Sequence, residues 1–209
     1  MALTMTTIVG TALEMAEAEG IDGLSLRRLA DRLGVRAPAL YWHIPGKRAL
    51  LDEMVDVIVR PAVPIWNSAP VYGWDAWLMG AARAMRAALR AHRGGPAIAV
   101  GAGLDRAVNL GVFIERTVAV LHDQLSIDLG AATRLAGGFN AFVLGRIAEE
   151  SAVPTLDEAT VTALRGRFPL LAEGLSMRAA QGYAVGGDED FDLLVRIWIE
   201  GIRAVFVVG

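Results

Sequence analysis

The sequence contains no cysteine, and this absence removes several kinds of chemistry at once. Disulfide bonds, thiolate metal sites and cysteine nucleophiles are excluded, and the composition suits a reducing cytoplasm, where we expect the protein to work. Histidine is scarce as well. The three histidines, His43, His92 and His122, lie in no HExxH or similar frame. We therefore expect no metal, no cofactor and no enzymatic activity.

Long apolar runs and a basic leader are also missing. Hydrophobic residues make up 54% of the chain, but charges, glycines and prolines interrupt every stretch of the roughly 18 residues that a membrane span needs. The first ten residues carry no basic segment of the kind that opens a secretory signal. The sequence thus predicts no membrane contact and no secretion, with the apolar content used in a buried core.

The net charge of −3 conceals a local excess of basic residues. Residues 27–48 contain six arginines and lysines against one acid, Asp31, a local charge of +5. Acidic residues cluster before and after this stretch. A single basic surface on an acidic protein favours specific DNA binding, because attraction to phosphates stays confined to one face. The six are Arg27, Arg28, Arg32, Arg36, Lys47 and Arg48.

Helical periodicity runs through almost the whole chain and predicts an all-α fold. Near the N-terminus, Gly20 suits a helix stop, and Ser25 can cap a second helix. Gly34 suits the left-handed position that ends that helix. Pro38 suits the first turn of a third helix, and Pro45 and Gly46 end this third helix. The first helix has an apolar face of Ile8, Ala12, Leu13 and Ala16, and a fourth turns Leu50, Leu51, Met54, Val55 and Ile58 inward.

The rest of the chain divides into a connector and a longer helical region. Residues 61–73 carry three prolines and read as the connector. We expect helices over about 74–92, 105–123, 128–150, 156–180 and 188–207, with a short helical segment at 96–101. Residues 186–190, two glycines followed by three acids, predict a mobile loop before the last helix.

Two short helices joined by a tight glycine turn, the second opening with proline, form a helix-turn-helix pattern. Many small helical hairpins share this pattern, but a longer ordered run of residues accompanies it here. The run resembles the tetracycline-repressor (TetR) family. The matching residues are Gly23-Leu24-Ser25-Leu26-Arg27-Arg28-Leu29-Ala30, Leu33-Gly34-Val35, Leu40-Tyr41-Trp42-His43 and Lys47-Arg48-Ala49-Leu50-Leu51-Asp52, with weaker similarity at Trp74, His92-Arg93, Phe142-Val143-Leu144-Gly145, Phe168-Pro169-Leu170-Leu171 and Gly201.

The resemblance implies a fold and a function. It implies a three-helix helix-turn-helix domain over residues 1–46, a connecting helix and linker over 47–72, and a helical ligand-sensing and dimerisation domain over 73–209. It implies a transcriptional regulator, most simply a repressor, that a small molecule releases from a double-stranded DNA operator. It also implies a homodimer, paired through the helices predicted at 128–150 and 188–207.

A recognition helix at about 37–43 would enter the major groove, and its neighbours would contact phosphates. Arg27 and Arg36 can reach a guanine edge or a phosphate, and Lys47 lies at the start of the next helix, where a cation favours phosphate. Trp42 could equally be part of the core, and Arg28 and Arg32 could form a solvated face. The predicted DNA-binding residues are Ser25, Arg27, Arg36, Ala37, Pro38, Tyr41, Trp42, His43 and Lys47.

The resemblance breaks at the positions that handle the magnesium–tetracycline complex. Aligned through His92-Arg93, those polar residues of the tetracycline repressors fall on Ala62, Ala81, Ala99 and Ala102. Alanine side chains offer no donor atoms to a metal, so we expect neither a metal site nor a response to tetracycline.

Nearby residues predict an apolar pocket for a hydrophobic or amphipathic effector, with a few polar anchors. Ordinary core packing would produce the same pattern. A regulator without any effector, acting as a constitutive DNA-bound dimer or a partner-binding module, is a further alternative, and effector-dependent release of DNA would distinguish the two. The predicted pocket residues are Trp66, Trp77, Met85, Asn109, Phe113, Thr117, Phe139 and Asn140.

Overall fold

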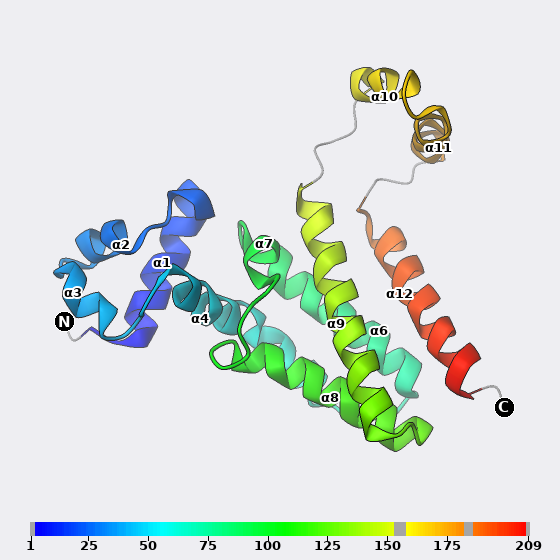
Figure 1. Ribbon diagram of the computed structural model, residues 1–209, viewed down its shortest axis with the longest axis horizontal. Helices are drawn as coiled ribbons and strands as arrows, with labels where there is room; N and C mark the ends of the chain where they lie inside the picture. Colours follow the sequence, from blue (N-terminus) through cyan, green and yellow to red (C-terminus); the bar gives the residue numbers. More distant parts are fainter. Residues whose placement is uncertain (1–2, 153–157, 182–185, 208–209) are drawn as a thin grey trace.

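A computed structural model describes residues 3–152, 158–181 and 186–207. Every regular element in these ranges is helical, which confirms the all-α prediction. The molecule is elongated, with a small helical head at one end and a larger body at the other (Figure 1). In the described ranges, no helix is long and apolar enough to cross a membrane.

The head consists of α1 (Met5–Glu19), α2 (Leu26–Leu33) and α3 (Ala37–Tyr41), with a 3-10 turn, η1 (Ile21–Gly23), between the first two. The helices of the head begin and end where the sequence predicts. The Ser25 hydroxyl accepts a hydrogen bond from the backbone N–H of Arg28, and Gly34 ends α2 in the left-handed conformation. Leu29, Leu40 and Ile44 are fully buried beneath these helices and belong to an apolar cluster that continues through α4 into the body.

Helix α4 (Lys47–Val59) joins the head to the body and packs against α1 on one side and against α7 (Gly95–Ala99) and α8 (Val108–Leu125) on the other. The connector predicted at 61–73 is partly helical: η2 (Arg60–Ala62) and α5 (Val63–Trp66) continue directly from α4. Pro61 and Pro64 sit in the first turns of these segments, where a missing N–H costs nothing. Only residues 67–73 lack helical structure.

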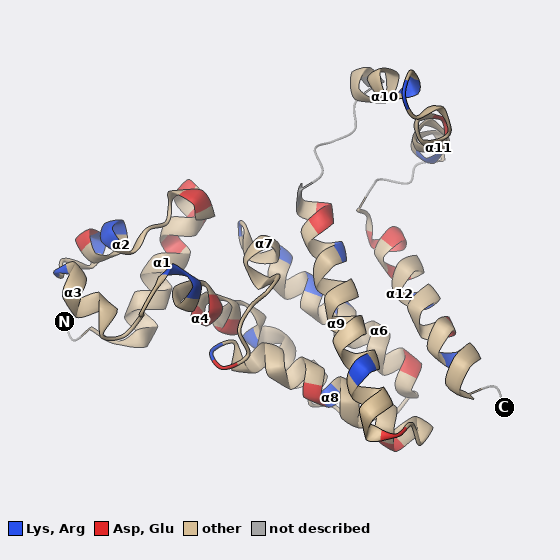
Figure 2. Ribbon diagram, in the orientation of Figure 1, with Lys and Arg blue, Asp and Glu red and all other residues tan. Residues whose placement is uncertain are grey.

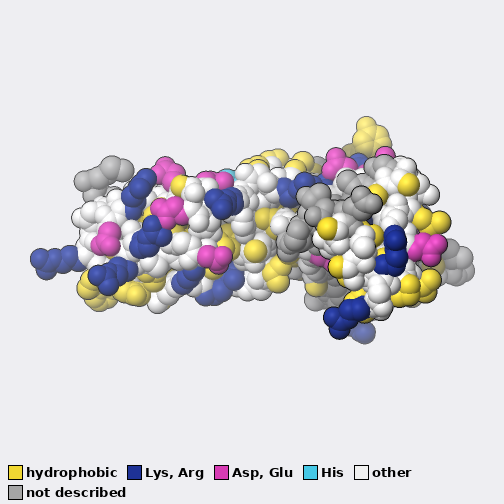
Figure 3. Space-filling view, turned by 90° about the horizontal axis from the view of Figure 1, so that it is seen from above, with side chains coloured by type: hydrophobic (Ala, Val, Ile, Leu, Met, Phe, Trp, Pro, Cys, Tyr) yellow, Lys and Arg dark blue, Asp and Glu magenta, His cyan; other side chains and the backbone are white. Residues whose placement is uncertain are grey.

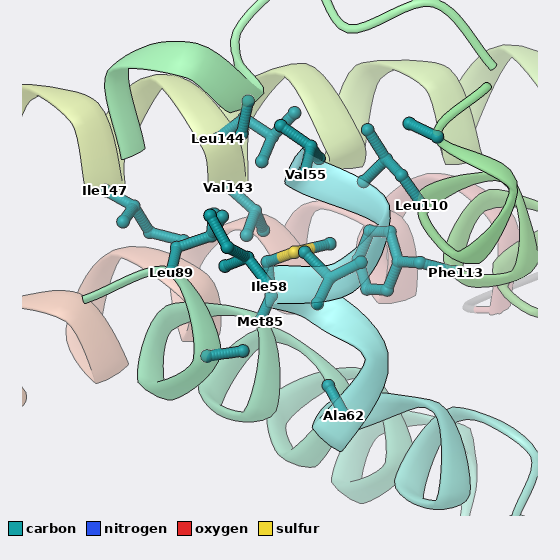
Figure 4. Packing of buried hydrophobic residues seen from close by; sticks show 14 of the residues in the cluster. Val55, Ile58, Ala62, Met85, Leu89, Leu110, Phe113, Val143, Leu144 and Ile147 are labelled. Atoms are coloured by element: carbon teal, nitrogen blue, oxygen red, sulfur yellow. The ribbon is translucent and has the colours of Figure 1, made fainter. Parts of the chain in front are cut away.

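The body packs α6 (Trp74–Arg90), α8 and α9 (Leu129–Ala152) around one apolar core, to which α4 also contributes. Figure 4 shows Ile58 of α4, Met85 of α6, Phe113 of α8 and Val143 of α9 meeting in this core. All four are almost completely buried. The last long helix, α12 (Asp188–Ile202), lies against α6 and beside α9, and continues into a π-helical turn, η3 (Arg203–Val207) (Figure 1).

Two sequence expectations about the C-terminal third were wrong. The pattern predicted as one helix at 156–180 forms two, α10 (Glu158–Arg165) and α11 (Pro169–Ala180), because a proline follows Phe168 and disfavours helical backbone there. These two helices pack against each other and stand apart from the body (Figure 1). Residues 156 and 157 lie outside the described ranges, as do 153–155.

The loop predicted at 186–190 is the second error. Gly186 and Gly187 precede the helix, but Asp188, Glu189 and Asp190 form the first turn of α12. Acidic side chains are favoured there because the helix N-terminus carries a partial positive charge.

Candidate functional site

The outward face of the head combines aromatic and basic side chains. Leu40 anchors α3 in the core, and the residues that follow it point away from the core. Tyr41 is 52% exposed and Trp42 is 86% exposed, so core packing does not account for Trp42. His43 is exposed as well. Helix α3 buries Leu40 and leaves the neighbouring aromatic side chains exposed, so its surface is suited to contact with another molecule.

The basic residues of the head divide into two groups. Arg28 is tied within the chain, because its guanidinium bonds to the carboxylate of Glu19 and to the carbonyl of Gly23. Arg48 likewise pairs with Asp52 and donates to the carbonyl of Ile98. Among the described residues, no carboxylate pairs with the exposed side chains of Arg27, Arg32, Arg36 and Lys47.

Figure 2 shows basic residues in α2 and at the start of α4, and Figure 3 shows basic side chains on the head end of the molecule, with acidic side chains among them. Seven of the nine predicted DNA-binding residues are exposed there, while Ser25 and Ala37 are partly buried. Ser25 caps α2, and the Lys47 ammonium donates to the carbonyl of Ile21 over 3.4 Å. The nine residues therefore share one end of the molecule, and their role in DNA binding stays a prediction.

The predicted pocket residues lie in the packed body. Four aromatic rings form a continuous chain from α5 to α12: Trp66 to Phe113 at 5.3 Å between centroids, Phe113 to Phe139 at 6.0 Å, and Phe139 to Trp198 at 5.1 Å. The first three rings are fully buried. Trp198 completes the chain and was not among the predicted residues. This arrangement fits a closed effector site and an ordinary core equally well.

The polar residues among these candidates differ in how they are satisfied. Asn109 donates from its backbone N–H and its amide to the carboxylate of Asp56. Thr117 is fully buried, and its hydroxyl donates to the carbonyl of Phe113 over 2.8 Å. The Oδ1 of Asn140 is buried and has no hydrogen-bond partner among the described residues.

Contacts between head and body come from residues that the sequence reasoning did not select. On α1, the Glu17 carboxylate contacts His92 Nδ1 at 3.0 Å and accepts from the backbone N–H of Arg93 at 3.1 Å. These residues follow α6, so the end of α1 is attached to the end of α6.

A row of acids on α4 makes the second attachment. The Asp52 carboxylate accepts from the N–H of Gly103, and Glu53 pairs with Arg106 at 3.1 Å. With the Asp56–Asn109 bonds, this row holds α4 to the loop before α8 and to its first turn. The spacing of acids at 52, 53 and 56 on one helix face was the available signal, but the sequence does not tell which segment they meet.

A second feature that the sequence reasoning missed is the α6–α12 seam, formed by Asp75, Arg83 and Arg86 of α6 facing Arg203, Asp192 and Asp188 at the end of the chain. The pairs follow an antiparallel order: Arg86 with Asp188 at 2.6 Å, Arg83 with Asp192, and Asp75 with Arg203 at 2.6 Å. Hydrogen bonding to Arg83 lowers the pKa of Asp192 below its usual value.

Arg86 is the centre of this seam and is 8% exposed. It donates to the buried carboxylate of Glu150 at 2.7 Å and to the carbonyl of Gly186 at 2.9 Å, and its guanidinium lies 5.0 Å from the centroid of Phe191. Burial alone would lower the pKa of Arg86, but the bonds to Asp188 and Glu150 raise it. A cleft of about 670 Å³ lies over the seam, and its lining charges are largely paired with one another.

Two family models match the chain. One, described as bacterial regulatory proteins of the tetR family, covers residues 8–54, and the other, described as a tetracyclin repressor-like C-terminal domain, covers residues 69–206. Together these regions include most of the head, the first part of α4 and most of the body. The chain belongs to the TetR family.

Relatives within the TetR family agree with this assignment. The tetracycline repressor of class A from transposon 1721 of Escherichia coli is 43% identical over 101 residues, 47% of this chain and 46% of that protein. The matched region thus spans about half the length of this curated relative.

Solved structures extend the similarity to the whole chain. The TetR-family protein ActR of Streptomyces coelicolor, in complex with (S)-DNPA, is 28% identical with a TM-score of 0.81, covering 99% of this chain and 100% of that one. BioQ with its double-stranded DNA operator is 25% identical with a TM-score of 0.64, covering 84% and 99%.

The four alanines that the sequence resemblance aligns with the tetracycline-handling positions lie in the body. Ala62, Ala81 and Ala99 are almost completely buried, and Ala102 is partly buried. Ala81 contributes only its carbonyl, which accepts a hydrogen bond from the Trp66 indole at 3.1 Å. These methyl side chains fill core space and present no ligand atoms to a metal.

Proposed function

We propose that the protein is a sequence-specific DNA-binding transcriptional regulator, acting as a repressor that a small apolar effector releases from its operator. The observation that carries the proposal is the head surface, where Arg27, Arg36 and Lys47 pair with no carboxylate of the described residues and Tyr41 and Trp42 are exposed. Cations that are not neutralised by a carboxylate are available to phosphates, and the amphipathic aromatics are available to groove edges. The TetR-family relative BioQ, solved with its operator, supports DNA as the partner.

Dimerisation belongs to the same proposal. Helix α12 exposes Leu193 and Ile197 on the face turned away from the core, 53% and 59% exposed. Beside it, α9 exposes the small residues Gly137, Ala141 and Gly145. Two adjacent helices with uncovered apolar and small faces suit a bundle with the same pair from a second copy. A dimer presents two heads, and each short recognition helix contacts too few base pairs to be specific alone.

Selection from a random DNA pool tests the DNA half of the proposal. Purified protein at low salt should enrich a roughly palindromic site, and binding to that site should weaken steeply as salt rises, because phosphate contacts release counterions. Arg36 and Ala37 depart from the tetracycline repressors, which carry Glu and Gln there, so the selected site should differ from the tetracycline operator. Enrichment of no sequence, or strong binding to the tetracycline operator itself, would refute this reading.

The effector half concerns the body. The aromatic chain through Phe113 and Phe139, and the alanines at the tetracycline-handling positions, favour an apolar organic effector held without a metal. ActR, solved with (S)-DNPA, supports a small organic molecule as the class. Once a compound releases the selected DNA, release should persist in EDTA. Loss of release with EDTA and its return with magnesium would contradict the assignment.

Two variants locate the effector site within the body. Trp77→Ala and Phe113→Ala should each weaken release by the compound, because these side chains would supply much of the apolar contact area. Folding is checked by circular dichroism and by unchanged operator affinity. If both variants fold and release as the unaltered protein does, the effector binds elsewhere.

A further inference from the structure

Asn140 lies on α9, next in the chain to Phe139 of the aromatic chain. It belongs to a helical row with Ala136 and Leu144, both buried, so its side chain begins at the edge of the core. Its Oδ1 is buried, while the residue as a whole is partly buried. The amide oxygen is therefore shielded from solvent although another part of the residue reaches the surface.

An unpaired buried oxygen at this place needs an explanation. Buried carbonyl oxygens nearly always accept a hydrogen bond, because burial removes water and leaves the lost bond uncompensated. The two other polar candidates form side-chain hydrogen bonds as donors: the Asn109 amide N–H donates to Asp56, and the Thr117 hydroxyl donates to the carbonyl of Phe113. Among the described residues, Asn140 Oδ1 is the one buried side-chain nitrogen or oxygen atom without a hydrogen-bond partner. An apolar residue at position 140 would complete the core without that cost.

We propose that Asn140 is the polar anchor of the effector site, and that its Oδ1 accepts a hydrogen bond from a hydroxyl donor on an otherwise aromatic effector. The inference rests on the proposed function, in which an apolar effector enters the body beside Phe113 and Phe139. The rings supply flat apolar contact area, and the amide supplies selectivity. A ligand without a donor leaves the oxygen unpaired and binds more weakly.

Thermal unfolding at fixed protein concentration tests the unpaired oxygen without any ligand. Asn140→Leu keeps a similar volume and removes the amide, so the midpoint should rise by about 2–4 °C. The matched control is Asn109→Leu, which removes an amide that is bonded to Asp56, and its midpoint should fall. A fall in Asn140→Leu as well would mean that the amide has a partner within the protein, and would overturn the proposal.

Calorimetric titration with 2-naphthol and 2-methoxynaphthalene tests the anchor itself. These probes share the aromatic body, and only the first carries a hydroxyl donor. The unaltered protein should bind 2-naphthol about tenfold more tightly, the effect of roughly one hydrogen bond to a buried group. Asn140→Leu should remove this preference, whereas Asn140→Asp, which keeps an acceptor, should retain it.

Either of two results overturns the proposal: persistence of the preference in Asn140→Leu, or no binding of either probe to the unaltered protein. Operator binding is measured on the same samples with the selected DNA. A protein that binds its operator and shows no naphthol preference would separate failure of this inference from failure of the proposed function.

Discussion

Arginine side chains are in different environments in the head and in the α6–α12 seam. In the head, Arg27 and Arg36 extend from the surface with no carboxylate partner among the described residues. In the seam, Arg83 and Arg86 each pair with an aspartate of α12, and Arg86 also holds the buried carboxylate of Glu150. Composition alone does not distinguish these arginines. The difference supports the proposal that the unpaired arginines of the head face an outside partner, while the paired and buried arginines of the seam hold the fold together.

The largest expected effect comes from the centre of the seam. Arg86→Met should destabilise the protein by about 2–3 kcal/mol, because the buried Glu150 loses its shortest ion pair and keeps only the longer contacts with Arg146 at 3.3 Å and Arg90 at 3.8 Å. Urea unfolding at fixed protein concentration measures the change. The double variant Arg86→Met with Glu150→Leu should recover most of it, since it removes both buried charges. A single variant as stable as the original would mean that the seam is not a structural element.

The head should respond in DNA affinity and hardly in stability. Arg36→Ala should weaken binding to the selected operator by about 1–3 kcal/mol and relax its preference at particular bases, if the side chain reads a base edge. Lys47→Ala should weaken binding to all DNA sequences about equally. It should also reduce the slope of log affinity against log salt concentration by about one. Fluorescence anisotropy at several salt concentrations measures both.

Arg28→Ala is the matched control for these variants, because Arg28 is paired with Glu19 and Gly23. It should reduce DNA affinity less than Arg36→Ala does. An Arg28 effect on affinity as large as that of Arg36 would remove the distinction between paired and unpaired cations in the head.

The glycine turn between α2 and α3 should give a smaller effect. Gly34 has a φ of +68°, and a Cβ added there meets no atom within 4 Å. Gly34→Ala should therefore cost about 1 kcal/mol through backbone conformation alone. Gly10, within α1, also has open space but helical backbone, so Gly10→Ala should stabilise by about 0.5–1 kcal/mol. Equal shifts of the same sign in thermal unfolding would contradict this account.

The smallest effect concerns the pH dependence of the seam. Because the pKa of Asp192 is lowered in the folded protein, its stabilisation is present above the unfolded value of about 3.9 and is lost as the pH falls through the folded value. The stability difference between the original protein and Asp192→Asn should be below about 1 kcal/mol at pH 7, since the pair is partly exposed, and should shrink below about pH 4. Glu189→Gln is the control from the same turn. A difference that grows on acidification would reverse the sign.

The head could be predicted from sequence almost residue by residue, because its signals are local. Ser25, Gly34 and Pro38 each act within a few residues of their own position, and each appears in the structure in the expected role. The two errors in the C-terminal third have local causes as well. Phe168, which precedes a proline, breaks the helix predicted at 156–180, and the acids from Asp188 onward belong to a helix N-terminus rather than a loop.

The two candidate sites also differ in how far local sequence signals predict them. For the head, the family pattern and the basic cluster locate the surface, and the exposure of Trp42 excludes its burial in the core. For the body, apolar residues at helical spacing predict burial but do not distinguish a pocket from a core. Only the pairing of polar atoms separates Asn140 from Asn109 and Thr117, and that depends on which side chains meet.

The sequence by itself determined most of the helices, the caps and stops of the head, the family, and the basic end of the chain, because these follow from short-range backbone preferences and from a continuous run of motif residues. The tertiary structure alone decided which charges are free and which are paired. Arg86 and Asp188 are separated by 102 positions and Glu17 and His92 by 75, and no periodicity encodes such meetings. The sequence shows only that both positions carry a positive charge. The packing of α12 onto α6 places Arg86 in buried ion pairs that hold the fold together, whereas Arg36 lies on the exposed surface of the head, where we propose that it contacts DNA.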